Sequence, residues 1–286
     1  MSSADDRQFD LAREWLADAD SILLGSGAGL SAAAGIDYGD KQWFAENLTP
    51  MLQYGISTCA EILGGMCLPP LLQWGYLSHQ LEFVRFGLID HPVYRLQYDA
   101  LAERDYFIHT SNVDALYERH GFDSERIYTP QGDYARMQCV EPCTDETWET
   151  RPMLERIREH TDPDTWQLSD EALLPCCPNC GGPMFMNVRA AHWFLETPYL
   201  PQRERLLSWL DLVSDRRLLV IEIGAGFNTP GVVRWPCEQI TERHPSARMI
   251  RVNPFNADVP EALRDRSLSL ACDGKTFVSA VFGSDT

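Results

Sequence analysis

The stretch SILLGSGAGLSAAAGI, residues 21–36, decides the fold. Residues 21–24 have the pattern of a short buried strand, and the glycines at positions 27 and 29 follow it directly. Glycine lets the backbone approach a phosphate closely, and a helix N-terminus offers free N–H groups. The stretch therefore predicts a strand, a turn and a helix that form a first candidate ligand site. Position 32 is alanine, so the ordinary G-x-G-x-x-G spacing is absent, and a tight turn without a ligand fits the same residues.

Further strands and helices alternate along the chain around this stretch. Apolar runs predict strands at 106–109, 218–223 and 248–252. Helical patterns occupy 6–19, 92–103, 114–120, 203–213 and 232–243. Strands that alternate with helices indicate a parallel sheet covered on both faces. We therefore expect an α/β protein with a Rossmann-like parallel sheet.

Two insertions interrupt the alternation and predict a second, smaller lobe. Residues 38–90 are rich in aromatic residues and glycine and have a mostly helical pattern, and residues 139–187 carry four cysteines at ligand spacing. The predicted Rossmann-like domain comprises residues 1–37, 91–138 and 188–286. The predicted small helical and zinc-binding lobe comprises residues 38–90 and 139–187.

Composition limits the classes of partner. A chain of 286 residues with 44% hydrophobic content can bury a substantial core. No stretch approaches the roughly 18 apolar residues of a membrane span, and the polar, acidic start of the chain is unlike a secretory signal. The formal charge of −18 disfavours nucleic acid and anionic membranes as partners. We expect a cytoplasmic monomer.

The cysteine spacing is that of a metal site. The cysteines Cys139 and Cys143 form one close pair, and Cys177 and Cys180 form a second. Two such pairs have the reach of tetrahedral zinc coordination, and four thiolates leave no open position for catalysis. The sequence therefore predicts a structural zinc ion. The adjacent Cys176 could replace Cys177, although the Cys-x-x-Cys-Gly pattern favours Cys177.

Two polar side chains follow the predicted strand at 106–109. Asn112 and Asp114 lie just beyond its carboxyl end, where ligands bind in open α/β sheets. A pair of Asx residues at such a junction is also a common helix cap. Both interpretations are open from the residues alone.

The order of these motifs resembles that of the sirtuins, the NAD-consuming protein deacylases and ADP-ribosyltransferases. The motifs that carry the resemblance include Thr110-Ser111-Asn112-Val113-Asp114, Gln131-Gly132, the cysteine quartet, Gly224-Ala225-Gly226 and Val252-Asn253. The chain departs from the usual pattern at Asp37-Tyr38-Gly39-Asp40, in place of Pro-Asp-Phe-Arg, and at Ser111, in place of glutamine.

The resemblance implies an NAD site and roles for individual residues. It implies that Asn112 contacts the nicotinamide ribose, that Asp114 contacts the nicotinamide carboxamide and that Gln131 is the third catalytic residue. It places the adenosine half of NAD near Asn253 and Asp273. The implied NAD-binding residues also include those of the two glycine turns, which are Gly27, Ala28, Gly29, Ser31, Gly224, Ala225 and Gly226.

Gln131 stands where most sirtuins have a histidine that acts as general base. An amide cannot take a proton near neutral pH, and general-base assistance contributes about 10²–10⁴-fold to a rate. Deacylation needs that base, whereas ADP-ribosyl transfer needs only nicotinamide departure and an incoming nucleophile. We therefore expect an NAD-dependent protein mono-ADP-ribosyltransferase.

The segment Gln131-Gly132-Asp133-Tyr134 resembles the macrodomain-linked branch of the sirtuins, called class M. Membership of that branch implies mono-ADP-ribosylation of a lipoylated carrier protein, with a macrodomain hydrolase as a functional partner. The alternatives are an NAD glycohydrolase, a non-catalytic NAD or ADP-ribose sensor and a weak deacylase. His192 and His109 are the candidates to replace the missing base.

Overall fold

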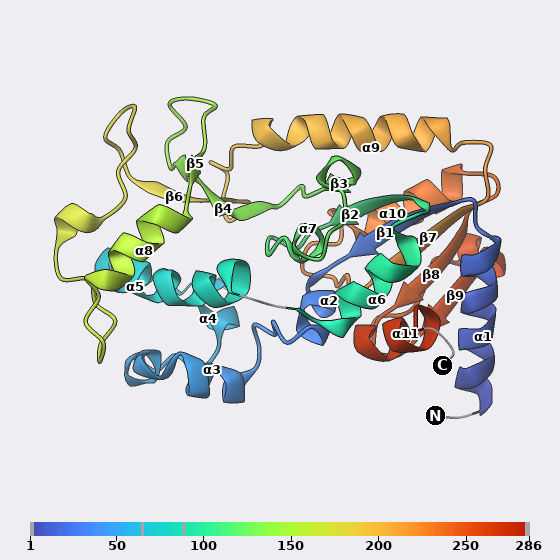
Figure 1. The fold of residues 1–286 in the computed structure, drawn as a ribbon, viewed down its shortest axis with the longest axis horizontal. Coiled ribbons are helices and arrows are strands. Elements are labelled where there is room, and N and C mark those ends of the chain that lie inside the picture. Colours follow the sequence, from blue (N-terminus) through green and yellow to red (C-terminus); the bar gives the residue numbers. More distant parts are fainter. Residues whose placement is uncertain (1–2, 64–65, 88–89, 284–286) are drawn as a thin grey trace. The chain divides into compact units, whose positions relative to one another are not determined.

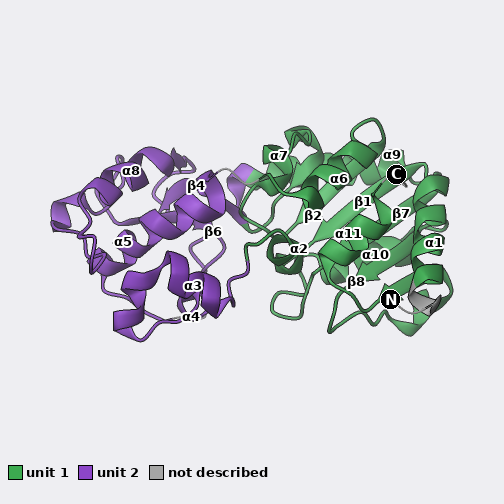
Figure 2. Ribbon diagram, turned by 60° about the horizontal axis from the view of Figure 1, so that its bottom comes forward, with its two compact units in different colours: residues 1–36, 89–131, 199–286 green, residues 37–88, 132–198 purple. Residues whose placement is uncertain are grey.

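The structure is a computed structural model that describes residues 3–63, 66–87 and 90–283. The chain divides into two compact units (Figure 2). Unit 1 contains residues 1–36, 89–131 and 199–286, and unit 2 contains residues 37–88 and 132–198.

Unit 1 is built on a six-stranded sheet with the order β3-β2-β1-β7-β8-β9. Its strands are β1 (Ser21–Ser26), β2 (Asp105–Thr110), β3 (Ile127–Tyr128), β7 (Leu218–Ile223), β8 (Arg248–Val252) and β9 (Ser267–Leu270). All neighbouring strands pair in parallel, and every residue of β1 and β7 is buried. The predicted Rossmann-like parallel sheet is therefore confirmed. The short strands β3 and β9 were not among the predicted strands.

Helices cover both faces of this sheet (Figure 1). The helices of unit 1 are α1 (Ser3–Asp18), α2 (Ala28–Ala33), α6 (Pro92–Leu101), α7 (Leu116–Arg119), α9 (Leu200–Leu212), α10 (Arg234–Arg243) and α11 (Gly274–Val281). Short 3₁₀ turns lie at Ser124–Arg126 and Glu261–Arg266, and a third, Thr197–Tyr199, crosses from unit 2 into unit 1 along the chain. Helix α11 packs against α1, α2 and α6, whereas α9 packs against β3 and α10 packs against β7 and β8.

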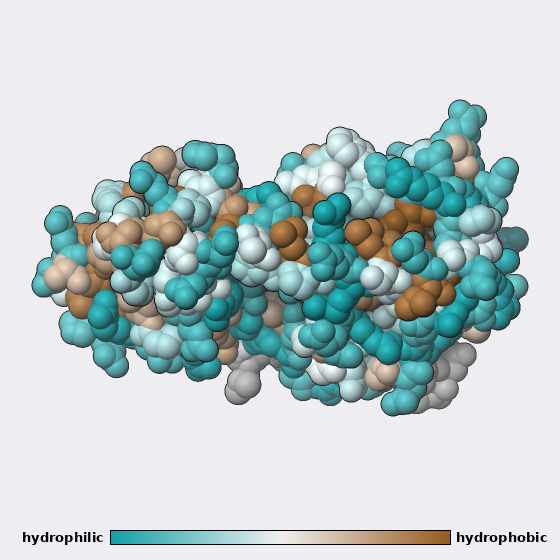
Figure 3. Space-filling model, turned by 90° about the horizontal axis from the view of Figure 1, so that it is seen from above, coloured by the Kyte–Doolittle hydropathy of each residue, from teal (hydrophilic) through white to brown (hydrophobic). Residues whose placement is uncertain are grey.

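Helix α9 leaves apolar side chains at the surface of unit 1. Its one buried residue is Leu206, while Leu207 and Leu212 are 48% and 73% exposed. Figure 3 shows apolar atoms among hydrophilic ones on the side of the molecule that carries this helix.

Within the described ranges, none of the helices combines the length and apolar character needed to cross a bilayer.

Unit 2 combines helices with a small antiparallel sheet. Its helices are α3 (Lys41–Asn47), α4 (Cys59–Leu63), α5 (Pro70–Leu81) and α8 (Arg151–Glu159), with 3₁₀ turns at Thr49–Tyr54 and Glu171–Leu173 and a short π-helix at Glu82–Phe86. Its sheet has the order β5-β4-β6, from β4 (Gly132–Cys139), β5 (Trp148–Glu149) and β6 (Met184–Val188). Helices α5 and α8 pack together.

The boundaries of unit 2 differ from those predicted for the small lobe. Segments 132–138 and 188–198 belong to unit 2, whereas their sequence predicts that they are part of the Rossmann-like domain. The reason is the pairing of β4 with β6, in which Met137 lies opposite Met186. This antiparallel ladder holds both segments in the unit that carries the cysteines.

Candidate functional site

Two glycine turns pack back to back in unit 1. The first follows β1 and contains Gly27 and Gly29, and the second follows β7 and begins at Gly224. A Cβ atom on Gly29 would lie 2.7 Å from the Gly224 Cα atom, and the Gly29 N–H donates a hydrogen bond of 3.1 Å to the Gly224 carbonyl. Gly224 also has a φ of +68°, which favours glycine. Close packing of two backbones therefore requires these glycines, whether or not a phosphate approaches.

The turns lie at the topological switch point of the sheet, between β1 and β7. Ligands of open α/β sheets bind at the carboxyl ends of the strands at such a point. Backbone hydrogen bonds of 2.9–3.1 Å join each turn to its neighbour along this edge: Ser111 N to Ser26 O, Gly27 N to Ile223 O, Gly224 N to Val252 O and Asn253 N to Leu270 O. The chain thus aligns the predicted turns of unit 1 along one edge of the sheet.

A hydrogen bond joins the first turn to the segment after β2. The Ser31 hydroxyl donates to Asp114 Oδ2 at 2.5 Å, and both residues are at most 4% exposed. Asp114 Oδ1 accepts from Leu116 N at 3.0 Å, so this carboxylate also binds the first residue of helix α7. Asn112 Nδ2 donates to the Gly27 carbonyl at 3.1 Å. Both Asx side chains therefore have defined orientations beside the first turn.

Gln131 follows β3, the strand beside β2. Its Oε1 atom is buried and accepts no hydrogen bond from the described residues. Buried polar atoms are nearly always satisfied, so an orphaned oxygen needs an explanation. A hydroxyl donor on a bound ligand would supply the missing partner.

Some of the other residues predicted to contact NAD make hydrogen bonds within the protein, and others border free space. Asn253 Nδ2 donates to the Ala225 carbonyl at 3.2 Å, which ties the turn after β8 to the turn after β7. Asp273 is exposed and caps helix α11, where it accepts from Thr276 N at 2.8 Å. In contrast, a Cβ atom on Gly226 would meet nothing within 4 Å, and Ala28 is exposed.

A buried ion pair that the sequence did not predict lies in the strands that lead into these turns. Glu222 and Arg251 are register partners on β7 and β8, both side chains are 0% exposed, and Arg251 Nη2 lies 2.6 Å from Glu222 Oε2. Burial raises the pKa of Glu222, although the positive charge of Arg251 opposes this shift. Arg234 extends the network by donating to the Asn256 carbonyl at 2.9 Å. The sequence does contain a sign of this ion pair, because Glu222 and Arg251 carry opposite charges within two largely apolar predicted strands.

The two histidines proposed as replacement bases have different environments. His109 is 4% exposed and stacks on Tyr128 with ring centroids 5.1 Å apart. Burial lowers its pKa to about 4, and neither ring nitrogen has a hydrogen-bond partner among the described residues. His192 belongs to unit 2 and is exposed.

The four predicted zinc ligands form a cluster in unit 2. The Sγ atoms of Cys139, Cys143, Cys177 and Cys180 all lie within 4.8 Å of one another. The Cys139–Cys180 and Cys143–Cys177 pairs are each 3.6 Å apart, close to the ~3.8 Å that tetrahedral Zn–S bonds of about 2.3 Å require. Cys176 is outside the cluster. The thiol chemistry and the spacing therefore fit a structural zinc ion, with Cys177 as the ligand.

Two polar groups donate hydrogen bonds to sulfur atoms of the cluster. Asn179 Nδ2 donates to Cys143 Sγ at 3.2 Å, and Gly182 N donates to Cys180 Sγ at 3.4 Å. Burial works to raise the pKa of Cys177, but backbone N–H groups of Cys180 and Asn179 outweigh it and bring that pKa to about 7. The turn after Cys177 is thus prepared for a deprotonated, metal-binding sulfur.

The fold defines the class of protein. The chain is similar to a solved mutant of a Sir2 homologue in complex with ADP-ribose, with a TM-score of 0.60, 17% identity and coverage of 99% of this chain and 95% of that one. A Sir2 homologue solved in complex with NAD gives a TM-score of 0.60 and 18% identity, over 96% of this chain and 92% of that one. The chain therefore has the sirtuin fold, an NAD-binding fold.

Two curated relatives narrow the comparison. The chain is 35% identical to a probable bifunctional ADP-ribose hydrolase/ADP-ribosyltransferase of Fusarium oxysporum f. sp. cubense, over 93% of this chain and 46% of that protein. It is 26% identical to a protein ADP-ribosyltransferase of Staphylococcus aureus strain Mu50, over 98% of this chain and 89% of that one. The chain thus spans about half the length of the fungal relative. No family model matches the chain.

Proposed function

We propose that this protein is a sirtuin-type, NAD-dependent protein mono-ADP-ribosyltransferase that releases nicotinamide. The observation that carries the proposal is Gln131, whose amide oxygen is buried without a partner among the described residues at the end of β3. The neighbouring strand β2 leads into Asn112 and Asp114. Similarity to two proteins named as ADP-ribosyltransferases supports the same activity.

The residues of the sheet edge provide the means to bind NAD. When bound, NAD supplies an ADP-ribosyl group and a nicotinamide leaving group. The turns that begin at Gly27 and Gly224 would hold its dinucleotide part, with Asn253 beside them. Asp114, fixed by Ser31, would accept from the nicotinamide carboxamide, and Asn112 would contact the nicotinamide ribose.

Gln131 restricts the reaction to one that needs no base at its position. Its Oε1 atom can accept from a ribose hydroxyl and so orient the sugar, but the amide cannot remove the proton. Without that assistance, a deacylase is slower by about 10²–10⁴-fold. An acceptor nucleophile with its own base is free of this requirement, which favours transfer over deacylation.

We further propose a lipoylated carrier protein as acceptor and a macrodomain hydrolase as functional partner. The name of the fungal relative pairs an ADP-ribose hydrolase with an ADP-ribosyltransferase, and this chain matches 46% of that protein. This pairing supports a hydrolase that removes the modification this chain adds. The charge of −18 supports a protein acceptor over a nucleic acid. We place the reaction in the cytoplasm and assign it to a monomer.

The test is nicotinamide release from NAD by the zinc-loaded protein. Three reactions are compared: NAD alone, NAD with a lipoylated carrier protein and NAD with an acetyl-lysine peptide. Carrier-dependent release with a mass gain of one ADP-ribose on the carrier is the expected result. Release that ignores every acceptor would identify a glycohydrolase, and NAD binding without release would identify a sensor. Fast peptide deacetylation would overturn the proposal.

A further inference from the structure

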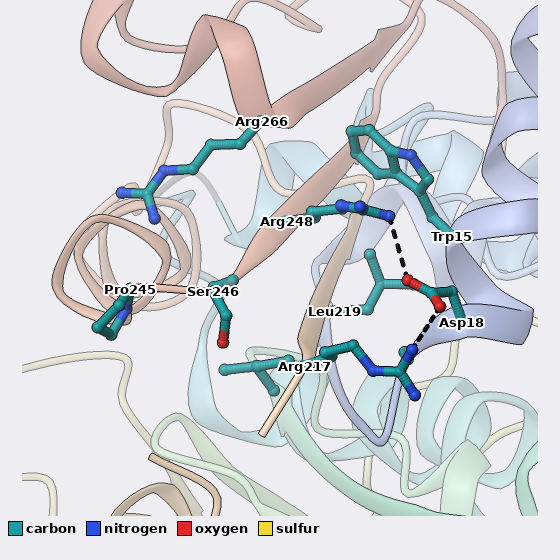
Figure 4. A pocket seen from close by; sticks show the side chains of 11 residues that line it. Trp15, Asp18, Arg217, Leu219, Pro245, Ser246, Arg248 and Arg266 are labelled. Atoms are coloured by element: carbon teal, nitrogen blue, oxygen red, sulfur yellow. Dashed lines mark hydrogen bonds and ion pairs between the residues drawn. The ribbon is translucent and has the colours of Figure 1, made fainter. Parts of the chain in front are cut away.

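A cavity of about 320 Å³ opens in unit 1 at the amino ends of β7 and β8 (Figure 4). Strand β7 spans about 17 Å at ~3.3 Å per residue, and its other end leads into the Gly224 turn. The cavity therefore lies at the opposite edge of the sheet from the candidate NAD site. Its volume is at the low end of the roughly 300–1,000 Å³ of small-molecule sites.

Three arginines from separate segments line this cavity. Arg217 directly precedes β7, Arg248 is the first residue of β8 and Arg266 directly precedes β9. In a chain with a net charge of −18, three guanidinium groups against the one carboxylate of the lining, Asp18, leave a local excess of positive charge. Guanidinium groups match the geometry of phosphate oxygens and bind them through paired hydrogen bonds.

One of these arginines has no acidic partner in the part of the chain that the structure describes. Arg266 donates from Nη1 to the His244 carbonyl at 2.9 Å and from Nη2 to the Glu242 carbonyl at 3.0 Å. Glu242 lies in the last turn of α10, and His244 is the residue that follows this helix. They fix the guanidinium in place without cancelling its full charge.

The other two arginines share a carboxylate that an anion could replace. Arg217 and Arg248 both contact Asp18, and Figure 4 shows Asp18 between them. Arg217 also holds Asp20 and keeps the pKa of that carboxyl well below its usual range. The Asp18 contacts are surface ion pairs with side chains 42–56% exposed, and such pairs contribute little stability. Rotation of Arg248 toward a ligand is therefore inexpensive, whereas Arg217 stays anchored to Asp20 by hydrogen bonds of 2.7–3.0 Å.

The rest of the lining is apolar. Apart from Asp18 and Ser246, whose hydroxyl donates to the Arg216 carbonyl, it is formed by Trp15, Ala19, Leu218, Leu219, Pro245 and Ala247. An inorganic anion would not contact this apolar surface, and an uncharged flat molecule would not bind the guanidinium groups. A ligand that carries both a phosphate and a flat ring uses the whole cavity.

We infer that this cavity is a second ligand site, which binds a mononucleotide through phosphate contacts with Arg217 and Arg248. Arg266 supplies further positive charge, and the base lies on the apolar lining. The arginines and the switch-point turns occupy opposite ends of the same strands, so the two sites take separate ligands.

The test uses adenosine monophosphate as the probe and calorimetric titration of the full chain. We expect binding that the double variant Arg217→Gln/Arg248→Gln weakens by about tenfold or more, as loss of two charge-assisted contacts implies. The matched control is Arg264→Gln, an exposed arginine outside the cavity, and it should bind like the unchanged protein. Adenosine and inorganic phosphate should each bind about tenfold more weakly than the monophosphate.

A second measurement locates the ligand independently of the arginine variants. The Trp15 indole N–H resonance, assigned with Trp15→Phe, should shift on titration with adenosine monophosphate. Asn253→Ala distinguishes this cavity from the candidate NAD site, because it alters only the latter. Binding that Asn253→Ala abolishes and the arginine double variant leaves intact would overturn the inference. An unmoved Trp15 resonance at saturation would overturn it as well.

Discussion

The Ser31 hydroxyl donates a 2.5 Å hydrogen bond to Asp114 Oδ2 across 83 positions of sequence. Ser31 belongs to α2, which follows β1, and Asp114 lies between β2 and α7. The other oxygen of the carboxylate accepts from Leu116 N at 3.0 Å. One buried carboxylate therefore connects the first glycine turn to the start of a helix after the neighbouring strand.

We predict that Ser31→Ala destabilises the protein by about 1.5–3 kcal/mol, because a hydrogen bond to a charged group is lost in a buried place. Urea unfolding followed by circular dichroism measures this change. The double variant Ser31→Ala/Asp114→Asn should lose less than the sum of the two single variants, because they share the same contact. Additive losses would show that the two side chains act separately.

Gly29→Ala tests the back-to-back packing of the two turns. Its new Cβ atom would lie 2.7 Å from Gly224 Cα, so the backbones must separate and stability should fall by about 1–3 kcal/mol. Gly226→Ala is the matched control, since its Cβ atom would meet nothing within 4 Å and should change stability by less than about 0.5 kcal/mol. The midpoint of urea unfolding separates the two. Equal midpoints would contradict the packing argument.

The role of Gln131 can be tested by restoring a base. Gln131→His should raise deacetylation of an acetyl-lysine peptide by up to about 10²–10⁴-fold over the unchanged protein, because the imidazole can accept a proton near neutral pH. Mass spectrometry of the peptide measures the rate. The control is Gln42→His, an exposed position on α3, which should leave the rate unchanged. A rate in the unchanged protein equal to that of Gln131→His would argue against a base-dependent difference.

The zinc site predicts a difference between two exposed cysteines. Cys143→Ser should lose the metal and leave unit 2 susceptible to proteolysis, because structural zinc supplies about 10–16 kcal/mol of binding free energy in small zinc peptides. Cys176→Ser should keep one zinc ion per chain, since Cys176 is outside the cluster. Elemental analysis and limited proteolysis provide the readouts. Zinc retained in Cys143→Ser and lost in Cys176→Ser would reverse the ligand assignment.

The parallel sheet was predictable because each long strand is largely apolar and leads into a turn. Strands β1, β7 and β8 have this pattern, whereas β3 has two residues and β9 has four, too few for a periodic signal. The sheet of unit 2 was also missed, and with it the boundaries at 132 and 198, because its pairing joins segments far apart in the chain.

The candidate site was predictable to a similar extent. Its residues follow strand ends, and the carboxyl ends of parallel strands share one edge, so their common location follows from the fold. Contacts made by side chains across the sheet could not be read from the chain. The Glu222–Arg251 pair and the Ser31–Asp114 hydrogen bond depend on strand order and register, which one sequence does not specify.

The buried His109 predicts a pH dependence of stability. Its pKa falls from an ordinary 6.5 to about 4 in the folded protein, because burial disfavours the charged ring. Between these values the unfolded chain binds the proton and the folded chain does not, so stability is fully present above pH 6.5 and decreases as the pH falls toward about 4. The full loss is about 3 kcal/mol at ~1.4 kcal/mol per unit of pKa.

His109→Leu isolates this contribution. The variant removes the titrating ring and keeps an apolar side chain in the core, so its free energy of unfolding should change less with pH than that of the unchanged protein. Urea unfolding of both proteins at a series of pH values between 4 and 6.5 gives the difference, in which contributions common to both proteins cancel. The difference should move by about 3 kcal/mol in favour of the variant as the pH falls through this window. A constant difference would show that His109 is solvated or charged in the folded protein, and it would restore this residue as a candidate base.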